Sequence, residues 1–403
     1  MDFNFTDVIF ALSCALDHVE HELTGTTAFH GKRVAAIAAA MGKKTGLTQE
    51  QLLDLMGCAV MHDCALTEYV QAEYHGSFQK ASEADLMRHL EIHCTKGEEH
   101  ITYIPFRGNV NGAVLYHHEN ADGSGPFGKE SGQIPDYAKW IHLAEDLDSR
   151  FDLSLMNRDK YQAILIYLLS NQGILFDKQT VELFQQVFPY EQLHFLKDGK
   201  VNLFLSGMAP SMQQNCTPEQ LMHFSKIFAV ITDYKSRYTR HHSVGVADKA
   251  FIMGIYYGAG EQQAAKLYVA GAFHDIGTLV IDKDLLEKPD KLTDREYQYI
   301  KSHIDELKRL FAGVTGMEDI IRWASRHHEK LDGSGYPMGF TEQDLDQWDR
   351  LIACLDIYQA LIEKRSYKES VSHDKAMIIL RQMAKKKELD EKICEDIGNV
   401  FMP

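Results

Sequence analysis

Apolar residues recur at intervals of three and four along most of the chain, whereas strictly alternating runs are rare. This spacing gathers apolar side chains on one face of an α-helix, so it predicts a mainly helical protein. One segment differs: residues 192–205, QLHFLKDGKVNLFL, alternate on both sides of Asp198-Gly199, a pair typical of tight hairpin turns. We therefore expect an all-α fold in which this segment alone suits a small β-ribbon.

Three short polar stretches predict helix starts. Residues 217–220, TPEQ, combine a threonine N-cap, a proline at the first helical position and a glutamine three residues after the cap. Residues 82–85, SEAD, begin a helix that leads to His93. Residues 293–296, TDRE, form a second capping box. The helix that follows this box is expected to place four residues on one face: Ile300, His303, Ile304 and Leu307.

An internal repeat involves half of the histidines. The chain has 20 His beside only 3 Trp and 9 Pro, and ten of these His fall in matching frames of the two halves. The offset between the frames is 212 residues at first and 210 after a small slip. Because five His and two Asp coincide in order, the two halves are interpreted as copies of one unit. The matched positions are His30 with His242, His62-Asp63 with His274-Asp275, His93 with His303, His117-His118 with His327-His328, and Asp146 with Asp356.

The repeat defines the expected domain organisation. The first copy occupies residues 1–191, the second copy residues 216–403, and residues 192–215 form a connector. The connector contains the candidate ribbon and leads into the polar stretch SMQQNCTPE. The predicted fold class is all-α, with two tandem helical domains, a short connector and a possible small β-ribbon in it.

Each copy presents five His and two Asp from separate expected helices, a donor set that suits Fe, Mn, Zn or Ni. Seven ligands are too many for one four-coordinate ion, but two ions bridged by a carboxylate would use them all. Such a pair provides a hydroxide nucleophile and stabilises the oxygens of a phosphoryl centre, so it suits phosphoester hydrolysis. The candidate ligands are His242, His274, Asp275, His303, His327, His328 and Asp356 in the second copy, and His30, His62, Asp63, His93, His117, His118 and Asp146 in the first.

Each element of these sets has a simpler interpretation when taken alone. A single His within an apolar helix is usually a satisfied core residue, and residues 332–335, DGSG, are typical of a turn. The occurrence of the ordered set in both halves favours the metal site. His241 has Phe29 as its counterpart in the first copy, so we interpret it as a neighbour of the site and not as a ligand.

Two motifs in the second copy resemble a known family. Residues 327–337, HHEKLDGSGYP, and residues 274–277, HDIG, look like the signature of the HD-GYP cyclic-dinucleotide phosphodiesterases, and the resemblance covers most of residues 216–403. It implies HD-type helical domains and two divalent metal ions per active site, commonly iron or manganese. It also implies that cyclic di-GMP or 3′,3′-cyclic GMP-AMP is hydrolysed to the linear dinucleotide through a hydroxide that bridges the metals.

The resemblance assigns roles to the candidate ligands of the second copy. Asp275 becomes the bridging carboxylate and forms the catalytic pair with His274. Some family members hold a third metal with a Glu four residues before the first His, but Tyr238 stands there, so we expect two metals. The two groups of ligands are His242, His274 and Asp356 for one metal, and His303, His327 and His328 for the other.

The same resemblance identifies residues for substrate binding. Arg365 and Lys368 match positions that grip the substrate phosphate, and Tyr336 offers a stacking face in the loop beside the site. Arg365 and Lys368 also suit the solvent-exposed end of a helix. A tyrosine such as Tyr336 in a loop of this kind equally suits a local core position.

Three departures from the family pattern limit these expectations. Thr278 stands where the family usually has a phosphate-contacting Lys, so the preferred dinucleotide stays open. The first copy reads HDCAL and HHENADGSGPFG, without Tyr-Pro in the corresponding frame, and has Leu155 in place of the phosphate-gripping Arg. We expect a first copy that binds metal but grips substrate poorly, and a second copy that carries the main activity.

Composition restricts the partners and the compartment. With 42 Lys+Arg against 58 Asp+Glu, the net charge of −16 disfavours a nucleic-acid polymer but permits a small dinucleotide at a local positive site. The seven Cys are scattered and never form a CxxC pair, and no apolar stretch is long enough to span a membrane. We expect a cytoplasmic protein in which the two domains contact each other and a signalling protein is a candidate partner.

Two other functions remain open. The HD elements alone would also suit a phosphohydrolase that acts on linear nucleotides, although the GYP segment argues against it. Thr278 and the altered first loop also leave room for a non-catalytic receptor or scaffold that binds the dinucleotide.

Overall fold

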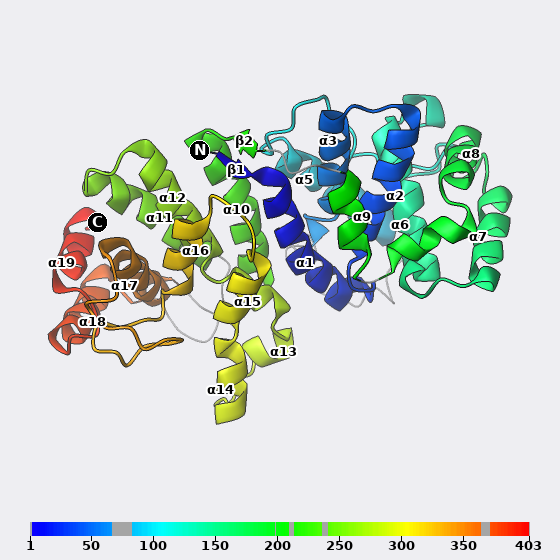
Figure 1. Ribbon diagram of the computed structural model, residues 1–403. Helices are drawn as coiled ribbons and strands as arrows, with labels where there is room; N and C mark the ends of the chain where they lie inside the picture. The colour runs from blue at the N-terminus through cyan, green and yellow to red at the C-terminus, as the bar shows by residue number, and fades with distance from the viewer. Residues whose placement is uncertain are drawn as a thin grey trace. The chain divides into compact units, whose positions relative to one another are not determined.

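The computed structural model describes residues 2–66, 83–197, 199–208, 213–235, 241–363 and 371–402. It divides into two compact units (Figure 1). The N-terminal unit comprises Asn4–Gln213, and the C-terminal unit comprises Gln214–Pro403 together with Met1–Phe3. Both units are built almost entirely from helices, so the predicted all-α class with two helical domains is confirmed. The exact domain boundaries at residues 191 and 215 stay a prediction.

The described part of the N-terminal unit contains α-helices and short 3₁₀ helices. The matched histidines stand on α2 and α5, just after α3, and between α5 and α6, and α7 to α9 follow. The α-helices are α1 (Phe5–Thr24), α2 (His30–Thr45), α3 (Gln49–Val60), α5 (Glu83–Ile101), α6 (Asp136–Phe151), α7 (Arg158–Ser170), α8 (Lys178–Val187) and α9 (Val201–Met208). The 3₁₀ helices are η2 (Ser131–Gln133), η3 (Leu153–Leu155) and η4 (Tyr190–Leu196).

The C-terminal unit repeats this order of elements around its own cluster. Helices α11 and α2 both begin at the first matched histidine, His242 and His30. The helices are α10 (Pro218–Lys235), α11 (His242–Tyr256), α12 (Glu261–Phe273), η5 (Ile276–Val280), α13 (Lys283–Leu286), α14 (Asp294–Lys301), α15 (His303–Leu310), α16 (Glu318–Ser325), α17 (Gln347–Ile362), α18 (His373–Lys385) and α19 (Glu391–Val400).

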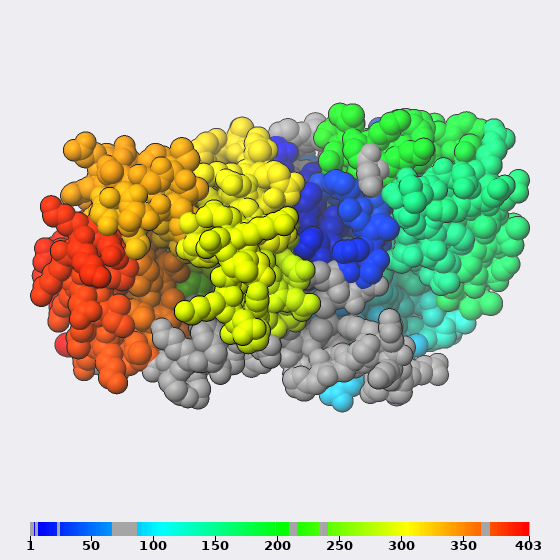
Figure 2. Space-filling view, turned by 90° about the horizontal axis from the view of Figure 1, so that it is seen from below, coloured from blue at the N-terminus to red at the C-terminus, as the bar shows by residue number. Residues whose placement is uncertain are grey.

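Buried helices form the centre of each unit. In the N-terminal unit, α2 packs against α3 and α6, and its residues 30–42 are all buried. In the C-terminal unit, α12 packs against α10 and α11, and its residues 267–273 are buried. Helices α18 and α19 pack on each other, and Figure 2 shows them together at the surface in orange and red. No helix in the described ranges is long and apolar enough to cross a membrane.

The capping signals in the sequence are confirmed. Helix α10 begins at Pro218, and Thr217 and Gln220 exchange hydrogen bonds at 3.1 Å in both directions. Helix α14 begins after Thr293, whose hydroxyl accepts from the backbone N–H of Glu296 at 3.3 Å. Each pair satisfies backbone donors that the first helical turn leaves open. Helix α5 begins at Glu83, next to Ser82, which lies outside the described residues.

The helix expected after residues 293–296 is interrupted at Ser302. The backbone N–H of Ser302 donates to Tyr299 in a tight turn at 3.1 Å, so α14 ends at Lys301 and α15 starts at His303. His303, Ile304 and Leu307 are still buried together. The single continuous helix was a wrong expectation, because periodicity alone does not reveal one local change of hydrogen-bond pattern.

The prediction of a β-ribbon at residues 192–205 is also wrong, because the two strands of the structure lie elsewhere in the chain. Residues 192–196 instead belong to η4 and residues 201–205 to α9, and the apolar residues Leu193, Leu196, Val201 and Leu205 are buried. A short run of alternating residues fits one face of a helix nearly as well as a strand, and packing decides between them. A two-stranded sheet does occur, between β1 (Asp2–Asn4) and β2 (Gln213–Asn215).

Candidate metal centre

Helix ends bring the seven candidate ligands of the C-terminal unit together. Most of these residues stand at or just beyond a helix end, where side chains from several helices converge on one place. His242 and His303 open α11 and α15, His274 caps the end of α12, and Asp275 precedes η5. His327 and His328 follow α16, and Asp356 lies within α17.

His242, His274 and Asp356 form the first group of ligands. Their donor atoms lie within 4.8 Å of one another. The Oδ1 atom of Asp356 is 3.0 Å from Nε2 of His242 and 3.9 Å from Nε2 of His274. This is the set that the sequence assigned to one metal.

The second group contains His303, His327, His328 and Asp275, again with donor atoms within 4.8 Å of one another. The Oδ1 atom of Asp275 lies 3.5 Å from Nε2 of His303 and 3.7 Å from Nε2 of His327. The structure therefore places the other three predicted histidines beside one another.

Asp275 lies between the two groups. While its Oδ1 atom faces His303 and His327, its Oδ2 atom is 3.3 Å from Nε2 of His274 in the first group. The two oxygens of one carboxylate thus face two separate sets of nitrogen donors. A carboxylate that bridges two metal ions needs this arrangement.

The ring nitrogens of three histidines are prepared for metal binding. Their Nδ1 atoms each lie 2.7–2.8 Å from a backbone carbonyl oxygen three residues earlier, which fixes the tautomer with the proton on Nδ1. Their Nε2 atoms are buried and have no hydrogen-bond partner among the described residues. Buried polar atoms without partners are costly, so these atoms indicate a missing ligand, and the donor set fits a metal. The three histidines are His274, His303 and His327.

The charges of the cluster also suit a cation. Burial alone would raise the pKa of Asp275, but His274 and its neighbours hold that pKa well below the usual value. Burial lowers the pKa of His327 well below its usual value and that of His328 to about 4. Ionised carboxylates and neutral imidazoles are the protonation states that bind metal ions.

His242 carries an additional carboxylate on its far side. Its Nδ1 atom lies 3.4 Å from Oε2 of Glu363, whose Oε1 accepts the backbone N–H of His241 at 3.0 Å. Although burial opposes it, Asp356 and Glu363 raise the pKa of His242 to about 10. Metal binding through Nε2 would therefore release a proton, and Glu363 orients the ring, a role that the sequence did not reveal.

The loop after His328 contributes an aromatic ring and a cation to the edge of the cluster. The ring of Tyr336 lies 4.6 Å from that of His328, measured between centroids. Lys301 places its ammonium group 4.5 Å from the centroid of Tyr336 and 4.6 Å from that of Tyr297. The sequence identified Tyr336 as a site residue but did not identify Lys301. Lys301 is two residues before the candidate ligand His303, and only the fold brings it next to Tyr336.

A glutamate holds this loop in shape. Glu329, which follows the His-His pair, accepts the backbone N–H groups of Met338 at 2.7 Å and Phe340 at 3.0 Å. A side chain at Gly335 would bring its Cβ within 2.5 Å of the Cα of Glu329, so only glycine fits. The motif that looked like a simple turn is therefore a loop closed by a buried carboxylate.

Of four further positions that the sequence singled out in the C-terminal unit, the structure describes only Thr278. Thr278 is half-buried, and its hydroxyl donates to the backbone oxygen of Asp275 at 2.7 Å, so it supports the turn of the HD motif. Arg365, Lys368 and Tyr238 lie outside the described residues, and their roles stay predictions.

The N-terminal unit contains a related cluster. Asp63 lies among three histidines: its Oδ2 is 3.7 Å from Nε2 of His62, and its Oδ1 is 3.3 Å from Nε2 of His93 and 3.6 Å from that of His117. His118 stands beside them, 5.0 Å from His93 between ring centroids. The divergent copy has thus kept the core of the arrangement.

At the seventh position of the N-terminal cluster, the structure places Glu145 and not Asp146 beside the other candidate ligands. Glu145 joins His62 and Asp63, with donor atoms within 4.8 Å, and its Oε1 lies 3.7 Å from Nε2 of His118. Asp146 pairs with Arg150 at 3.2 Å instead. The repeat offset missed this because the loop between the His-His pair and α6 is one residue shorter than its counterpart before α17.

His30 is supported by a buried aspartate–arginine pair, whereas Glu363 stands beside the Nδ1 atom of His242. Its Nδ1 lies 2.7 Å from Oδ2 of Asp148, whose Oδ1 accepts from Nε of the fully buried Arg33 at 2.7 Å. At the equivalent helix positions the C-terminal unit has Gly245 and Gln359, where a Cβ on the glycine would meet the amide at 2.3 Å. The two copies therefore support their first histidine in different ways.

These paired clusters on helical units are typical of HD-domain proteins, and a comparison with family models agrees. The model described as "HD domain" matches residues 15–179 and residues 223–393, which together make up most of the chain. The chain therefore belongs to the HD domain family, and both copies match the same model.

Several known proteins are similar to this chain. It is 27% identical over 405 residues to 3′3′-cGAMP-specific phosphodiesterase 1 of Vibrio cholerae serotype O1, an alignment that covers 98% of this chain and 91% of that protein. A probable cyclic di-GMP phosphodiesterase of the same organism is 37% identical over 123 residues, 28% of each chain. The crystal structure of a V. cholerae cyclic GMP-AMP-specific phosphodiesterase (V-cGAP3) matches with a TM-score of 0.67 and 20% identity over 100% of this chain and 99% of that one, which supports the fold.

Proposed function

We propose that this protein is a metal-dependent phosphodiesterase that hydrolyses a cyclic dinucleotide, either 3′,3′-cyclic GMP-AMP or cyclic di-GMP, to the linear dinucleotide. The observation that carries the proposal is the position of Asp275, whose two oxygens face two sets of histidines. Proteins of both specificities are among the relatives, and the one that aligns over nearly the whole chain is named for cyclic GMP-AMP. We therefore favour cyclic GMP-AMP as the substrate.

The donor set suits two divalent metal ions, with iron or manganese preferred and zinc or nickel as alternatives. A bound pair supplies a hydroxide nucleophile and positive charge at the scissile phosphate. In this proposal His242, His274 and Asp356 would hold one ion, the remaining three histidines of the cluster would hold the other, and Asp275 would serve both. His274 and Asp275 are the catalytic pair of the HD motif.

Residues at the edge of the cluster would position the substrate. Tyr336 offers one face of its ring beside His328, so a base of the dinucleotide can stack there. Lys301 places a cation next to this ring, which suits a phosphate and supplies part of the positive charge that a protein of net charge −16 needs locally. We propose that Arg365 and Lys368 add further phosphate contacts.

We further propose that the C-terminal unit, residues 216–403, carries the activity, and that the N-terminal unit, residues 1–191, is a partner domain. The N-terminal loop is one residue shorter: Phe127 donates to Glu119 as Met338 donates to Glu329, so Pro126 corresponds to Pro337 and the loop has no counterpart of the Tyr336 ring. Contact between the two domains, a signalling protein partner and a cytoplasmic location remain parts of this proposal.

The experiment compares two matched double variants of the full chain. Purified protein, loaded with manganese or iron, is incubated separately with the two cyclic dinucleotides, and the products are separated by chromatography. The proposal expects a linear dinucleotide from the parent and from His62→Ala/Asp63→Ala, and none from His274→Ala/Asp275→Ala. Circular dichroism verifies that both variants are folded.

Other results would contradict the proposal in distinct ways. Equal loss in the two folded variants would remove the division of labour between the units. Binding of both dinucleotides without cleavage by metal-loaded protein would identify a receptor. Faster hydrolysis of linear nucleotides would identify a broader phosphohydrolase.

A further inference from the structure

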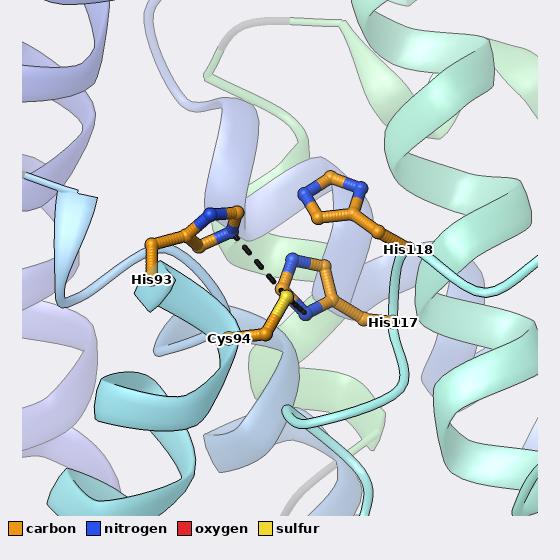
Figure 3. Close-up of side chains that lie close together, drawn as sticks. All are labelled: His93, Cys94, His117 and His118. Carbon is orange, nitrogen blue, oxygen red and sulfur yellow. Dashed lines mark hydrogen bonds between the residues drawn. The ribbon is translucent and has the colours of Figure 1, made fainter. Parts of the chain in front are cut away.

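The histidine cluster of the N-terminal unit includes a cysteine (Figure 3). Cys94 is fully buried on α5, next to His93. Its sulfur lies 3.7 Å from Nε2 of His93 and 3.7 Å from Nδ1 of His117. One donor atom from each of His93, Cys94, His117 and His118 lies within 4.8 Å of the other three.

The cysteine distinguishes the two copies. The residue that follows the matched histidine in the C-terminal unit is Ile304, which is buried and has no donor atom. The equivalent position of the C-terminal unit therefore holds a larger apolar side chain in the same kind of fold. A buried thiol at this position of the N-terminal unit adds a donor and is not needed to fill space.

The spacing of these atoms agrees with a tetrahedral ion. Zinc–sulfur and zinc–nitrogen bonds of the usual length, at tetrahedral angles, separate the two ligand atoms by about 3.6 Å. The observed 3.7 Å from the sulfur to Nε2 of His93 is close to this value. The Nδ1 atom of His93 faces the carbonyl oxygen of His89 at 3.2 Å, so its Nε2 is the nitrogen that carries a lone pair toward the cluster.

An unpartnered nitrogen supports the same conclusion. Nδ1 of His117 donates to the carbonyl oxygen of Val114 at 2.5 Å, so the nitrogen that could bind an ion is Nε2, which lies 3.6 Å from Oδ1 of Asp63 and is buried without a hydrogen-bond partner within the described ranges. The residue has no exposed surface, so water does not satisfy this atom from outside. Figure 3 shows the ring of His117 between Cys94 and His118.

We propose that His93, Cys94, His117 and His118 form a metal site in which the Cys94 sulfur is a ligand, a site suited to zinc. Coordination forms a metal–sulfur bond, breaks the S–H bond and releases one proton to solvent. Thiolate is a soft donor that favours zinc over manganese, in contrast to the all-nitrogen and oxygen donors of the C-terminal unit.

This donor set gives the N-terminal site a different chemistry. Four protein ligands are enough for a tetrahedral zinc shell, which is typical of structural sites, and the Asp63 carboxylate stands beside them, with its Oδ1 3.3 Å from Nε2 of His93. The N-terminal unit would then be stabilised by its ion without hydrolysing a phosphodiester. The inference stands apart from the catalytic proposal, because it concerns a bond that can be observed without any turnover.

The test uses cobalt as a spectroscopic probe. The full chain carrying His274→Ala/Asp275→Ala is freed of metal and titrated with Co²⁺ alone, so that the C-terminal centre contributes little to the signal. A thiolate ligand gives a sulfur-to-cobalt charge-transfer band in the near ultraviolet, and tetrahedral coordination gives visible bands. We expect both, and we expect stoichiometric Zn²⁺ to remove them.

Two substitutions and one control make the result specific. Cys94→Ile introduces the residue found in the C-terminal copy, and Cys94→Ser keeps the size of the thiol; both should abolish the charge-transfer band. Cys64→Ala serves as the control, because the sulfur of Cys64 is 3.7 Å from Nδ1 of His100 and outside the four-residue cluster. This control should keep the band.

The outcomes separate clearly. A parent titration without the charge-transfer band overturns the proposal, and so does a band that survives in a folded Cys94 variant. Circular dichroism establishes folding, and if one Cys94 variant does not fold, the other decides. Loss of catalysis elsewhere in the chain has no effect on these spectra, so failure of the proposed activity and failure of this site are distinguishable.

Discussion

The Oδ1 atom of Asp275 lies 3.5 Å from Nε2 of His303, yet this nitrogen has no hydrogen-bond partner in the part of the chain that the structure describes. The separation is too long for a strong hydrogen bond but close to the distance between two ligands of one metal ion, about 3.3 Å. The two side chains are thus arranged for an ion and not for each other.

The first prediction concerns this carboxylate. Asp275→Asn keeps the size of the side chain but removes the charge that faces both groups of histidines. We expect hydrolysis of the cyclic dinucleotide to fall by at least about 100-fold, because metal ions at the phosphate supply several kcal/mol of transition-state stabilisation. Metal content by mass spectrometry should fall with activity. The matched change Asp63→Asn should leave most of the activity intact, and an equal loss would contradict the assignment.

The second prediction concerns the stacking face. Tyr336→Ala should raise the KM for the cyclic dinucleotide by about tenfold, since stacking of a base on an aromatic ring contributes about 1–3 kcal/mol. Tyr336→Phe keeps the ring beside His328 and should retain most of the affinity. Steady-state kinetics of the three proteins provides the measurement. If the phenylalanine variant is as impaired as the alanine variant, the hydroxyl and not the ring face is responsible.

The third prediction uses two glutamates with one role. Glu329 accepts two backbone N–H groups of its loop, and Glu119 accepts those of Phe127 and Lys129 in the other copy, both at 2.5 Å. Either change to Gln leaves one N–H poorly paired, so each should lower the free energy of unfolding by about 1–3 kcal/mol. Only Glu329→Gln should also reduce hydrolysis. Denaturant unfolding and the activity assay test both parts, and a strong activity loss in Glu119→Gln would argue against it.

The fourth prediction separates Glu145 from Asp146. Because Glu145 faces the N-terminal cluster and Asp146 pairs with Arg150, Glu145→Gln should weaken metal binding by this unit and Asp146→Asn should not. Competition for Zn²⁺ with a coloured chelator, in protein that carries His274→Ala/Asp275→Ala, measures the difference. The reverse order of effects would restore Asp146 as the ligand.

The fifth prediction is a pH dependence of stability. Asp17 accepts the backbone N–H of Gly31 at 2.8 Å, and burial raises its pKa to about 6. The folded state therefore binds more protons than the unfolded state between about pH 4 and pH 6, so this group makes the free energy of unfolding fall by about 1–3 kcal/mol as pH rises through that window.

Asp17→Asn removes this titration while it keeps a carbonyl oxygen for Gly31. Urea unfolding of metal-free protein at a series of pH values should show a smaller decline for the variant than for the parent. Parallel curves would show that Asp17 does not titrate in this window.

Much of the fold and the site follows from local sequence signals. The matched histidines identified both clusters because the chain order of the candidate ligands is the same in each copy. Thr217 and Thr293 indicated two helix starts because each accepts a hydrogen bond from a residue only three positions later. Local chemistry decides such features, so sequence reasoning reaches them.

The errors have equally specific causes. The constant offset pointed to Asp146 and did not reveal Glu145, because it cannot detect a loop that is one residue shorter. Counting from the helix starts does detect it: Glu145 and Asp356 are both the tenth residue of their helices. Lys301 and Glu363 reach the cluster only through tertiary packing. The segment of residues 192–205 became helical because burial of four apolar side chains outweighed its alternating pattern.

The loop carboxylates bear on how two copies of one unit can diverge. Glu119 and Glu329 anchor their loops through backbone N–H groups, and every residue except proline supplies such a donor whichever side chain it carries. The side chains at the loop tip are therefore free to change while the path of the loop is preserved. Tyr336, which precedes Pro337 in one copy and has no counterpart before Pro126 in the other, is such a change. Exchange of the loop tips between the copies should therefore transfer ligand recognition from one unit to the other while the helices and the path of each loop stay the same.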